Sequence, residues 1–224
     1  MTLAVRLPEY PWDELAPLRD KARAFPGGMV DLSVGTPVDP VPPSIQDALT
    51  AAANAPGYPP TAGTAGLRAA AASWLARCHD VHVDPDSVLP VIGTKEFIAW
   101  LPVMLGLGAG DSVLFPALAY PTYDIGARLA GAAPVATDSL PDGPSQARLL
   151  WVNSPSNPTG RVLSAGQLRE AVAWARSRPG GCVLACDECY LELGWSVSPV
   201  SVLHRSVTDG SLDGVLEVDR KSVV

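Results

Sequence analysis

Short apolar runs alternate with longer amphipathic segments along most of the chain. The apolar runs predict buried strands at 88–92, 112–115, 134–137, 148–152, 182–186 and 214–218. The segments between them predict helices at 94–107, 121–130 and 164–178. Apolar strands that alternate with helices are typical of a mainly parallel sheet covered by helices on both faces. The pattern therefore predicts an α/β fold of three layers, αβα, with the strand at 214–218 as its last.

The N-terminal part has a different pattern, because prolines and glycines interrupt it. Residues 1–30 are predicted to form an arm with a short helix at 12–24, and an extended segment follows at 31–43. A second helix is expected at 44–53, with Ser44 as its N-cap.

A stronger helical signal follows a predicted loop at 57–63. The segment 64–78 is rich in alanine and contains no proline, which favours a helix. One face of this helix is expected to pack inward through Leu67, Ala71, Trp74, Leu75 and Cys78.

Composition narrows the class of protein and of partner. Of the 224 residues, 47% are hydrophobic and 17% are charged, which is typical of a compact soluble domain. The net charge of −7 argues against nucleic acid or an anionic membrane as partner. No run of about eighteen apolar residues occurs, so no membrane-spanning helix is expected. The first residues also lack the apolar core of a secretory signal.

The cysteines predict buried thiols rather than a metal site. They are Cys78, Cys182, Cys186 and Cys189. The three histidines do not stand at a spacing that would complete a zinc site with them. Reduced, buried thiols are typical of a cytoplasmic protein, so we expect that location and no metal.

Polar residues directly follow two of the predicted strands. Residues 153–160 follow one strand, and residues 187–190 follow another. The carboxyl ends of strands in an open α/β sheet are where such folds bind ligands. There Asp187 could keep a ring nitrogen protonated, while Asn157 and Tyr190 could bond a ring oxygen. Taken alone, each segment is also explained by an ordinary turn or cap.

Two further segments have residues suited to a phosphorylated, planar ligand. Gly93, Thr94 and Lys95 open a predicted helix, where backbone N–H groups and such side chains suit a phosphate. A plain helix cap is the simpler interpretation of this segment in isolation. Tyr120 follows the strand at 112–115, and its ring could stack on a ligand or pack on a strand-to-helix turn.

Several blocks recur along the chain in a fixed order, and together they identify a family. They are Leu32–Pro37, Gly57-Tyr58, Gly66–Arg68, Ile92–Glu96, Tyr120–Tyr123, Asn153–Gly160 and Asp187–Tyr190. Over about residues 5–218 the chain resembles the fold type I pyridoxal-phosphate aminotransferases of class I/II. Within them it is most similar to the actinobacterial N-succinyldiaminopimelate aminotransferases of lysine biosynthesis.

The resemblance implies pyridoxal 5'-phosphate (PLP) as cofactor and a specific set of binding residues. They are Gly93, Thr94, Lys95, Tyr120, Asn157, Asp187 and Tyr190, together with Tyr58 from a neighbouring subunit. By the same resemblance Gly35 lets the backbone approach the substrate carboxylate. A tyrosine that reaches across to another subunit implies a homodimer with shared sites.

The family's lysine that bonds the cofactor stands in a Ser-rich segment after a strand, and that segment is not found here. The lysines are Lys21, Lys95 and Lys221. Alignment places the family lysine at Val223, two residues beyond Lys221. We therefore predict that residues 219–224 are a foreign tail, that the chain is truncated at its C-terminus, and that this lysine is absent. Lys221 is the weaker alternative.

The expected organisation is an N-terminal arm at 1–30, from the family's small domain, and a partial PLP-binding large domain at 31–218. The expected reaction moves an amino group from glutamate to N-succinyl-2-amino-6-ketopimelate, so the partners are small amino and keto acids. Two alternatives stay open. A PLP-dependent C–S lyase on the same fold shares every motif, and the chain itself could be a catalytically inactive fragment or binding module.

Overall fold

The structure, a computed structural model, describes residues 7–8, 11–32, 35, 38–140, 146–219 and 222–223. The chain forms two compact units, one of Glu9–Pro60 and the other of Thr61–Val224 with Met1–Pro8. The first unit contains the helices α1 (Pro11–Glu14), α2 (Ala16–Arg23) and α3 (Pro43–Ala52). The predicted division by function at residue 30 stays a prediction.

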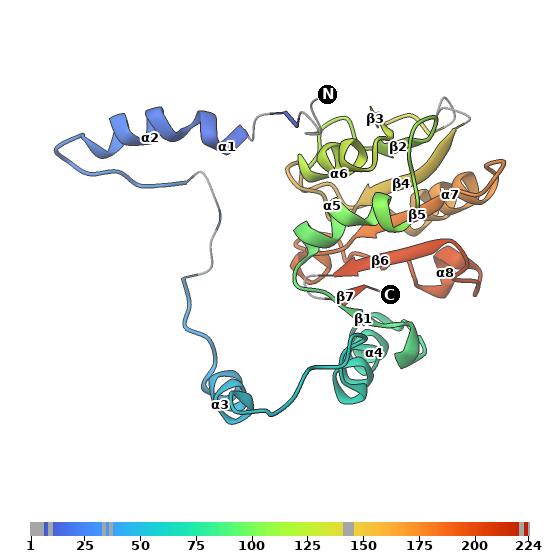
Figure 1. Cartoon of the computed structure of the whole chain (residues 1–224), viewed down its shortest axis with the longest axis horizontal. Coiled ribbons are helices and arrows are strands. Elements are labelled where there is room, and N and C mark those ends of the chain that lie inside the picture. The colour runs from blue at the N-terminus through green and yellow to red at the C-terminus, as the bar shows by residue number, and fades with distance from the viewer. Residues whose placement is uncertain are drawn as a thin grey trace. The chain divides into compact units, whose positions relative to one another are not determined.

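The second unit is built on a seven-stranded sheet in the order β1-β7-β6-β5-β4-β2-β3 (Figure 1). Its strands are β1 (Leu89–Pro90), β2 (Ser112–Phe115), β3 (Ala133–Ala136), β4 (Ala147–Asn153), β5 (Val183–Asp187), β6 (Val215–Asp219) and β7 (Ser222–Val223). The pairs from β3 through β2, β4 and β5 to β6 are all parallel. The predicted mainly parallel α/β sheet is confirmed.

Several helices of this unit begin at a residue whose side chain caps them. The helices of the unit are α4 (Ala65–His79), η1 (Pro85–Ser87), α5 (Thr94–Met104), α6 (Thr122–Ala130), α7 (Ala165–Arg176), η2 (Leu191–Leu193) and α8 (Arg205–Thr208). The Thr64 hydroxyl accepts a hydrogen bond from the Leu67 N–H, which satisfies a free donor at the start of α4. Ser164 and Gln167 form a reciprocal capping box at α7. Local chemistry thus determines where these two helices start.

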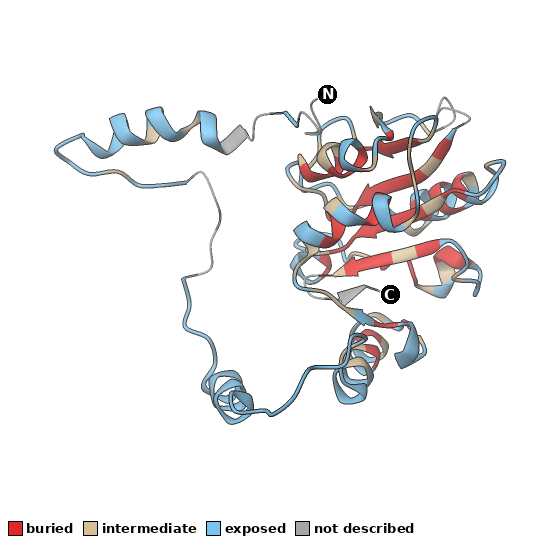
Figure 2. Cartoon of the chain, in the orientation of Figure 1, coloured by how far each residue is buried: buried red, intermediate tan, exposed pale blue. Residues whose placement is uncertain are grey.

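Helices cover both faces of the sheet, which makes the predicted three layers. Because side chains alternate along a strand, Val113 packs with α5 and α6 while its neighbour Leu114 packs with α4 and α7. The strand Ala147–Asn153 contributes to both cores in the same way, with Trp151 on the first face and Leu150 on the second. Figure 2 shows the buried residues concentrated in the strands and in the helix faces turned toward them.

Two local predictions in the helices were wrong. Ser44 is not the N-cap of α3, because the helix begins one residue earlier at Pro43, and Pro42 holds the cap position without a side-chain bond. Proline suits the first helical position, since its fixed φ fits the helix and no donor is lost. On α4, Leu67 and Cys78 are exposed, so the helix buries a narrower stripe than expected, centred on Leu75.

The prediction that 214–218 is the last strand was also wrong. A short strand, β7, pairs antiparallel with both β6 and β1. Two residues have no periodicity, so no pattern in the sequence could predict this strand. Pairing at this position needs only backbone N–H and C=O groups, which every non-proline residue supplies.

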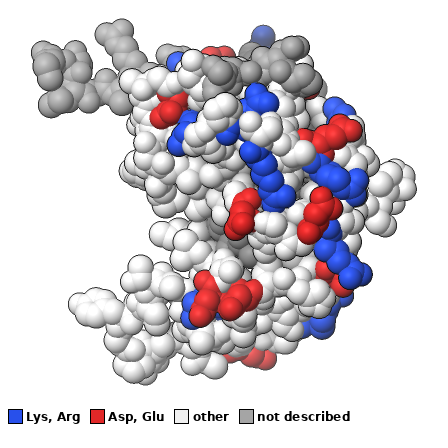
Figure 3. Space-filling view, turned by 90° about the vertical axis from the view of Figure 1, so that its right-hand side faces the viewer, with Lys and Arg blue, Asp and Glu red and all other residues white. Residues whose placement is uncertain are grey.

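The structure shows how charge is spread over one face and how long the helices are. On the face seen in Figure 3, acidic and basic side chains are interspersed rather than gathered into a patch of one sign. Within the described part of the chain, every helix is too short or too polar to cross a membrane.

Close packing of α5 on α6 gives a testable prediction. A Cβ added at Gly126 would lie 2.8 Å from the Ile98 carbonyl oxygen and 3.2 Å from that of Ala99. We expect Gly126→Ala to lower the free energy of unfolding by about 1–3 kcal/mol, because the two helices must move apart. Chemical denaturation measures this change.

Gly66→Ala in α4 is the matched control, because a Cβ there meets nothing within 4 Å. It replaces a helical glycine in open space, so it should leave stability unchanged or raise it by up to about 1 kcal/mol. Equal destabilisation by both variants would contradict the packing argument.

Candidate functional site

The carboxyl ends of β4 and β5 meet at one edge of the sheet. The strands are in register, with Asn153 opposite Asp187. The Asn153 amide donates to the backbone oxygen of Asp187 at 2.9 Å and to that of Pro155 at 3.2 Å. Its side-chain oxygen accepts from the Asn157 N–H at 2.6 Å. One buried amide therefore holds the loop after β4 against the end of β5.

Asp187 is a buried carboxylate with two donors already in place. Its side chain accepts from the Tyr123 hydroxyl at 2.7 Å and from the Cys189 N–H at 3.2 Å. Only 6% of the residue is exposed. Burial, and then the charge of Asp187, raise the pKa of Tyr123 well above its usual value, so this hydroxyl stays a donor at neutral pH. The carboxylate is thus fixed in direction by α6 and by its own turn.

Two other aromatic rings pack against the ring of Tyr123. The rings of Tyr123 and Trp151 stack with centroids 5.1 Å apart and an interplanar angle of 30°. Tyr120 meets Tyr123 edge-on at 6.3 Å. The predicted stacking residue Tyr120 therefore belongs to the same aromatic group as the tyrosine that bonds Asp187.

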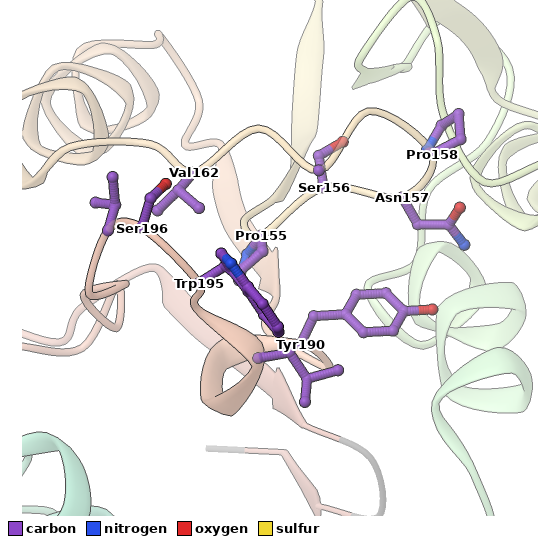
Figure 4. A pocket seen from close by; sticks show the side chains of 11 residues that line it. Pro155, Ser156, Asn157, Pro158, Val162, Tyr190, Trp195 and Ser196 are labelled. Carbon is purple, nitrogen blue, oxygen red and sulfur yellow. The ribbon is translucent and has the colours of Figure 1, made fainter. Parts of the chain in front are cut away.

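Asn157 and Tyr190 line one open pocket of about 590 Å³. Figure 4 shows their side chains extending to the same side from two different loops, with Trp195 on the Tyr190 loop. Burial raises the pKa of Tyr190, the charges of Cys189 and Asp187 add to the rise, and a hydrogen bond with Asn157 opposes it. Tyr190 is 38% exposed. The pair can therefore donate two hydrogen bonds to one ligand oxygen.

The start of α5 lies beside the turn that follows Asp187. The Cys189 thiol donates to the Thr94 hydroxyl at 3.5 Å. Burial is the main reason that the pKa of Cys189 is raised, so the thiol stays neutral. A Cβ added at Gly93 would meet nothing within 4 Å, which leaves room above the helix start. Lys95 is exposed on the first turn.

The structure brings together most of the predicted residues. Asn153 links Asn157 to Asp187, and Cys189 links Asp187 to Thr94. Tyr190 is hydrogen-bonded to Asn157. The other predicted residues are placed differently. Gly35 and Tyr58 are exposed residues of the Glu9–Pro60 unit, and their roles stay predictions. Lys221, like most of the Leu32–Pro37 block, lies outside the described residues.

The sequence did not predict two contacts that position the site. Asn153 holds the loop of Asn157, and Tyr123 orients Asp187. An asparagine at the last position of an apolar strand was the available signal for Asn153, since a buried amide needs partners. No such signal connects Tyr123 to Asp187, because 64 positions separate them.

The arrangement fits a phosphorylated heterocycle with a ring oxygen. A buried carboxylate can accept from a protonated ring nitrogen, and burial keeps water from competing. An amide and a hydroxyl can bond a ring oxygen, and the N–H groups that begin α5 can bond a phosphate. For a metal ion the described residues offer no cluster of three or more His, Cys, Asp and Glu side chains.

Comparison with known proteins agrees with this chemistry. The family model "Aminotransferase class I and II" matches residues 27–217. A 4-dedimethylamino-4-oxo-anhydrotetracycline transaminase from Streptomyces rimosus is 58% identical over 95% of this chain, which covers 59% of that protein. A probable aminotransferase from Mycobacterium tuberculosis is 57% identical over 96% of this chain and is covered to 52%. The chain thus spans little more than half the length of these relatives.

A solved structure adds a spatial match. It is the N-succinyldiaminopimelate aminotransferase from Mycobacterium tuberculosis, with 29% identity and a TM-score of 0.77. The match covers 94% of this chain and 57% of that one.

Asn153 gives a prediction that requires no ligand. Asn153→Ala removes three hydrogen bonds, so we expect a loss of about 2–3 kcal/mol in unfolding free energy. The Asn157 amide should also exchange with deuterium about ten-fold faster or more, because its acceptor is gone. Hydrogen-exchange mass spectrometry with peptide resolution measures the second effect.

Asn54→Ala is the control, because Asn54 is exposed and should tolerate the change within about 0.5 kcal/mol. Unchanged exchange at Asn157 in Asn153→Ala would show that another group holds this loop.

Proposed function

We propose, from the premise that this chain belongs to the class I and II aminotransferases, that it carries the cofactor half of a transaminase site. The observation that carries the proposal is the meeting of Asn157, Asp187 and Tyr190 at one sheet edge beside Thr94. The family is PLP-dependent. The proposed reaction is the transfer of an amino group between an amino acid and a carbonyl compound.

Each residue has a proposed task in holding PLP. Asp187 accepts from the ring nitrogen, and the Tyr123 hydroxyl keeps its carboxylate in place. Asn157 and Tyr190 donate to the phenolic oxygen. The start of α5, with Gly93, Thr94 and Lys95, binds the phosphate. When bound, PLP supplies an electron sink that makes amino-group transfer possible.

For the substrate we propose N-succinyl-2-amino-6-ketopimelate, with glutamate as amino donor. The structural match to an N-succinyldiaminopimelate aminotransferase supports this choice. Gly35 is proposed to let the backbone approach the substrate carboxylate. The remaining assignments are a homodimer, in which Tyr58 reaches the phosphate of the neighbouring subunit, and a location in the cytoplasm.

A polycyclic ketone is the second candidate substrate. The Streptomyces rimosus relative is named for an oxo-anhydrotetracycline. Its sequence identity to this chain is 58%, against 29% for the succinyldiaminopimelate enzyme of known structure. The pocket beside Asn157 and Tyr190 also favours this candidate. Its described lining contains no charged side chain and includes the fully exposed indole of Trp195. Such a lining suits a flat, uncharged body better than a dicarboxylate.

Cofactor binding tests the proposed function. Asp187→Asn keeps the shape of the side chain but loses its charge, so we expect the dissociation constant of PLP to rise by roughly 10–100-fold. Titration followed by tryptophan fluorescence or equilibrium dialysis measures this constant.

Asp47→Asn on the exposed surface of α3 is the matched control and should bind PLP like the parent. Pyridoxal without its phosphate should bind weakly to both. If Asp187→Asn binds PLP as tightly as the parent chain, Asp187 does not hold the ring nitrogen.

Supplying the acceptors one at a time separates the two candidate substrates. A protein that contains this chain, given glutamate and a single carbonyl acceptor, should form 2-oxoglutarate faster with its preferred acceptor. Trp195→Ala should lower kcat/KM for the polycyclic ketone by about ten-fold, because stacking area is lost. Equal rates for parent and variant with that ketone would remove Trp195 from substrate recognition.

A further inference from the structure

Two glutamates are buried side by side behind the proposed cofactor turn. Glu188 directly follows β5, and Glu217 lies on the neighbouring strand β6, opposite Cys186. Each is only 1% exposed. Both lie among residues of the core on the α4 and α7 side of the sheet, which include Cys186, Val202 and Val215. This is the face opposite to α5 and α6.

Three of their four carboxyl oxygens have no hydrogen-bond partner among the described residues. Glu188 Oε1 accepts from the Val202 N–H at 2.5 Å. Glu188 Oε2 and both oxygens of Glu217 are closed off from solvent and unpaired. An ionised carboxylate in such a place costs several kcal/mol, so the neutral form is favoured. Because these oxygens are buried in the core, a group from outside the core could bond them only if the core opened.

The charges around the pair do not relieve this cost. Those acting on Glu217 are Glu188, Asp219 and Asp187, all of them acidic. The Ser201 hydroxyl, from the segment before α8, and the Cys186 thiol, from β5, oppose the burial that raises the pKa of Glu188. From the end of α4, His79 interacts with Asp219 and Glu192, but burial lowers its pKa and keeps it neutral. Ionising both Glu188 and Glu217 would place two negative charges next to each other in the core, at a high cost in free energy.

We propose that Glu188 and Glu217 retain at least one proton between them at neutral pH and act as positioning residues for the Asp187–Tyr190 turn. The backbone of Glu188 belongs to that turn. Its N–H donates to the Val218 oxygen at 2.9 Å, and its oxygen accepts from the Leu191 N–H at 2.8 Å. A second charge would push Glu188 away from β6 and move its neighbour Asp187. Only this positioning role rests on the proposed function.

The direction of the pH effect follows from the two carboxyls. Burial raises the pKa of Glu188 from 4.5 to about 7, although the Val202 N–H opposes the rise. Burial, and then the charge of Glu188, raise the pKa of Glu217 well above its usual value. A carboxyl with a raised folded pKa stabilises fully below its unfolded pKa and loses that effect as pH rises through the folded pKa. Stability should therefore fall as pH rises from about 4.5 through 7 and beyond.

Thermal unfolding of the full chain between pH 5 and pH 9 tests the pair. Glu217→Gln removes one charge and keeps the shape of the side chain, so its Tm should fall less with pH than that of the parent. At pH 8 we expect its Tm to lie roughly 5 °C or more above the parent's. The Tm of Glu217→Leu should also fall less with pH than that of the parent. The control is Glu170→Gln, at an exposed site on α7, whose Tm should change with pH as the parent's does.

A uniform drop in Tm for Glu217→Gln and Glu217→Leu at every pH would overturn the proposal, because it would mean an ionised Glu217 with a cationic partner. The positioning role is tested by PLP affinity against pH. The parent should lose affinity above about pH 7 by several-fold, and Glu217→Gln should retain it. An identical alkaline loss in both would remove the positioning role. Failure of every variant to bind PLP would reject the proposed function, while the Tm profiles would still decide the pair.

Discussion

A buried carboxylate must be hydrogen-bonded, and the need to satisfy Asp187 organises the residues around it. Its two donors come from different places, the Tyr123 hydroxyl on α6 and the N–H of Cys189 in its own turn. Tyr123 is in turn placed by its stacking on Trp151 in β4. Moving any of these elements would leave the charge unpaired in the interior, which costs several kcal/mol. The direction of the carboxylate is therefore a property of the whole packed unit.

The same turn connects the two faces of the sheet. Asp187 faces the aromatic group of α6 and β4, and the next residue, Glu188, points into the opposite core. Because successive residues of an extended chain point to opposite faces, a charge on one face is one residue away from the other. This adjacency is what would let the proton on the Glu188 and Glu217 pair influence a carboxylate proposed to hold PLP.

Most of the fold of the Thr61–Val224 unit could be predicted from sequence. The strands and helices that were predicted from residue 64 on begin and end within three residues of their predicted positions, whereas the short elements η1, η2, α8 and β7 were not predicted. Their signals are local, since apolar period and capping residues such as Thr64 and Ser164 act within a few positions. The errors lie where those signals are weak. Ser44 competed with a proline for a helix start, and the two residues of β7 are too few to show a period.

The candidate site, like the fold, has a part that the sequence predicts and a part that it does not. The sequence by itself determined the chemical set, because strand ends in an α/β pattern, together with the resemblance, selected Asn157, Asp187, Tyr190 and the start of α5. Only the tertiary structure decided which groups hold them. Asn153 bonds the end of a strand 34 positions away, and Cys189 meets Thr94 across 95 positions. Such contacts are set by parallel strand pairing and packing between layers, and no local pattern in the chain records them.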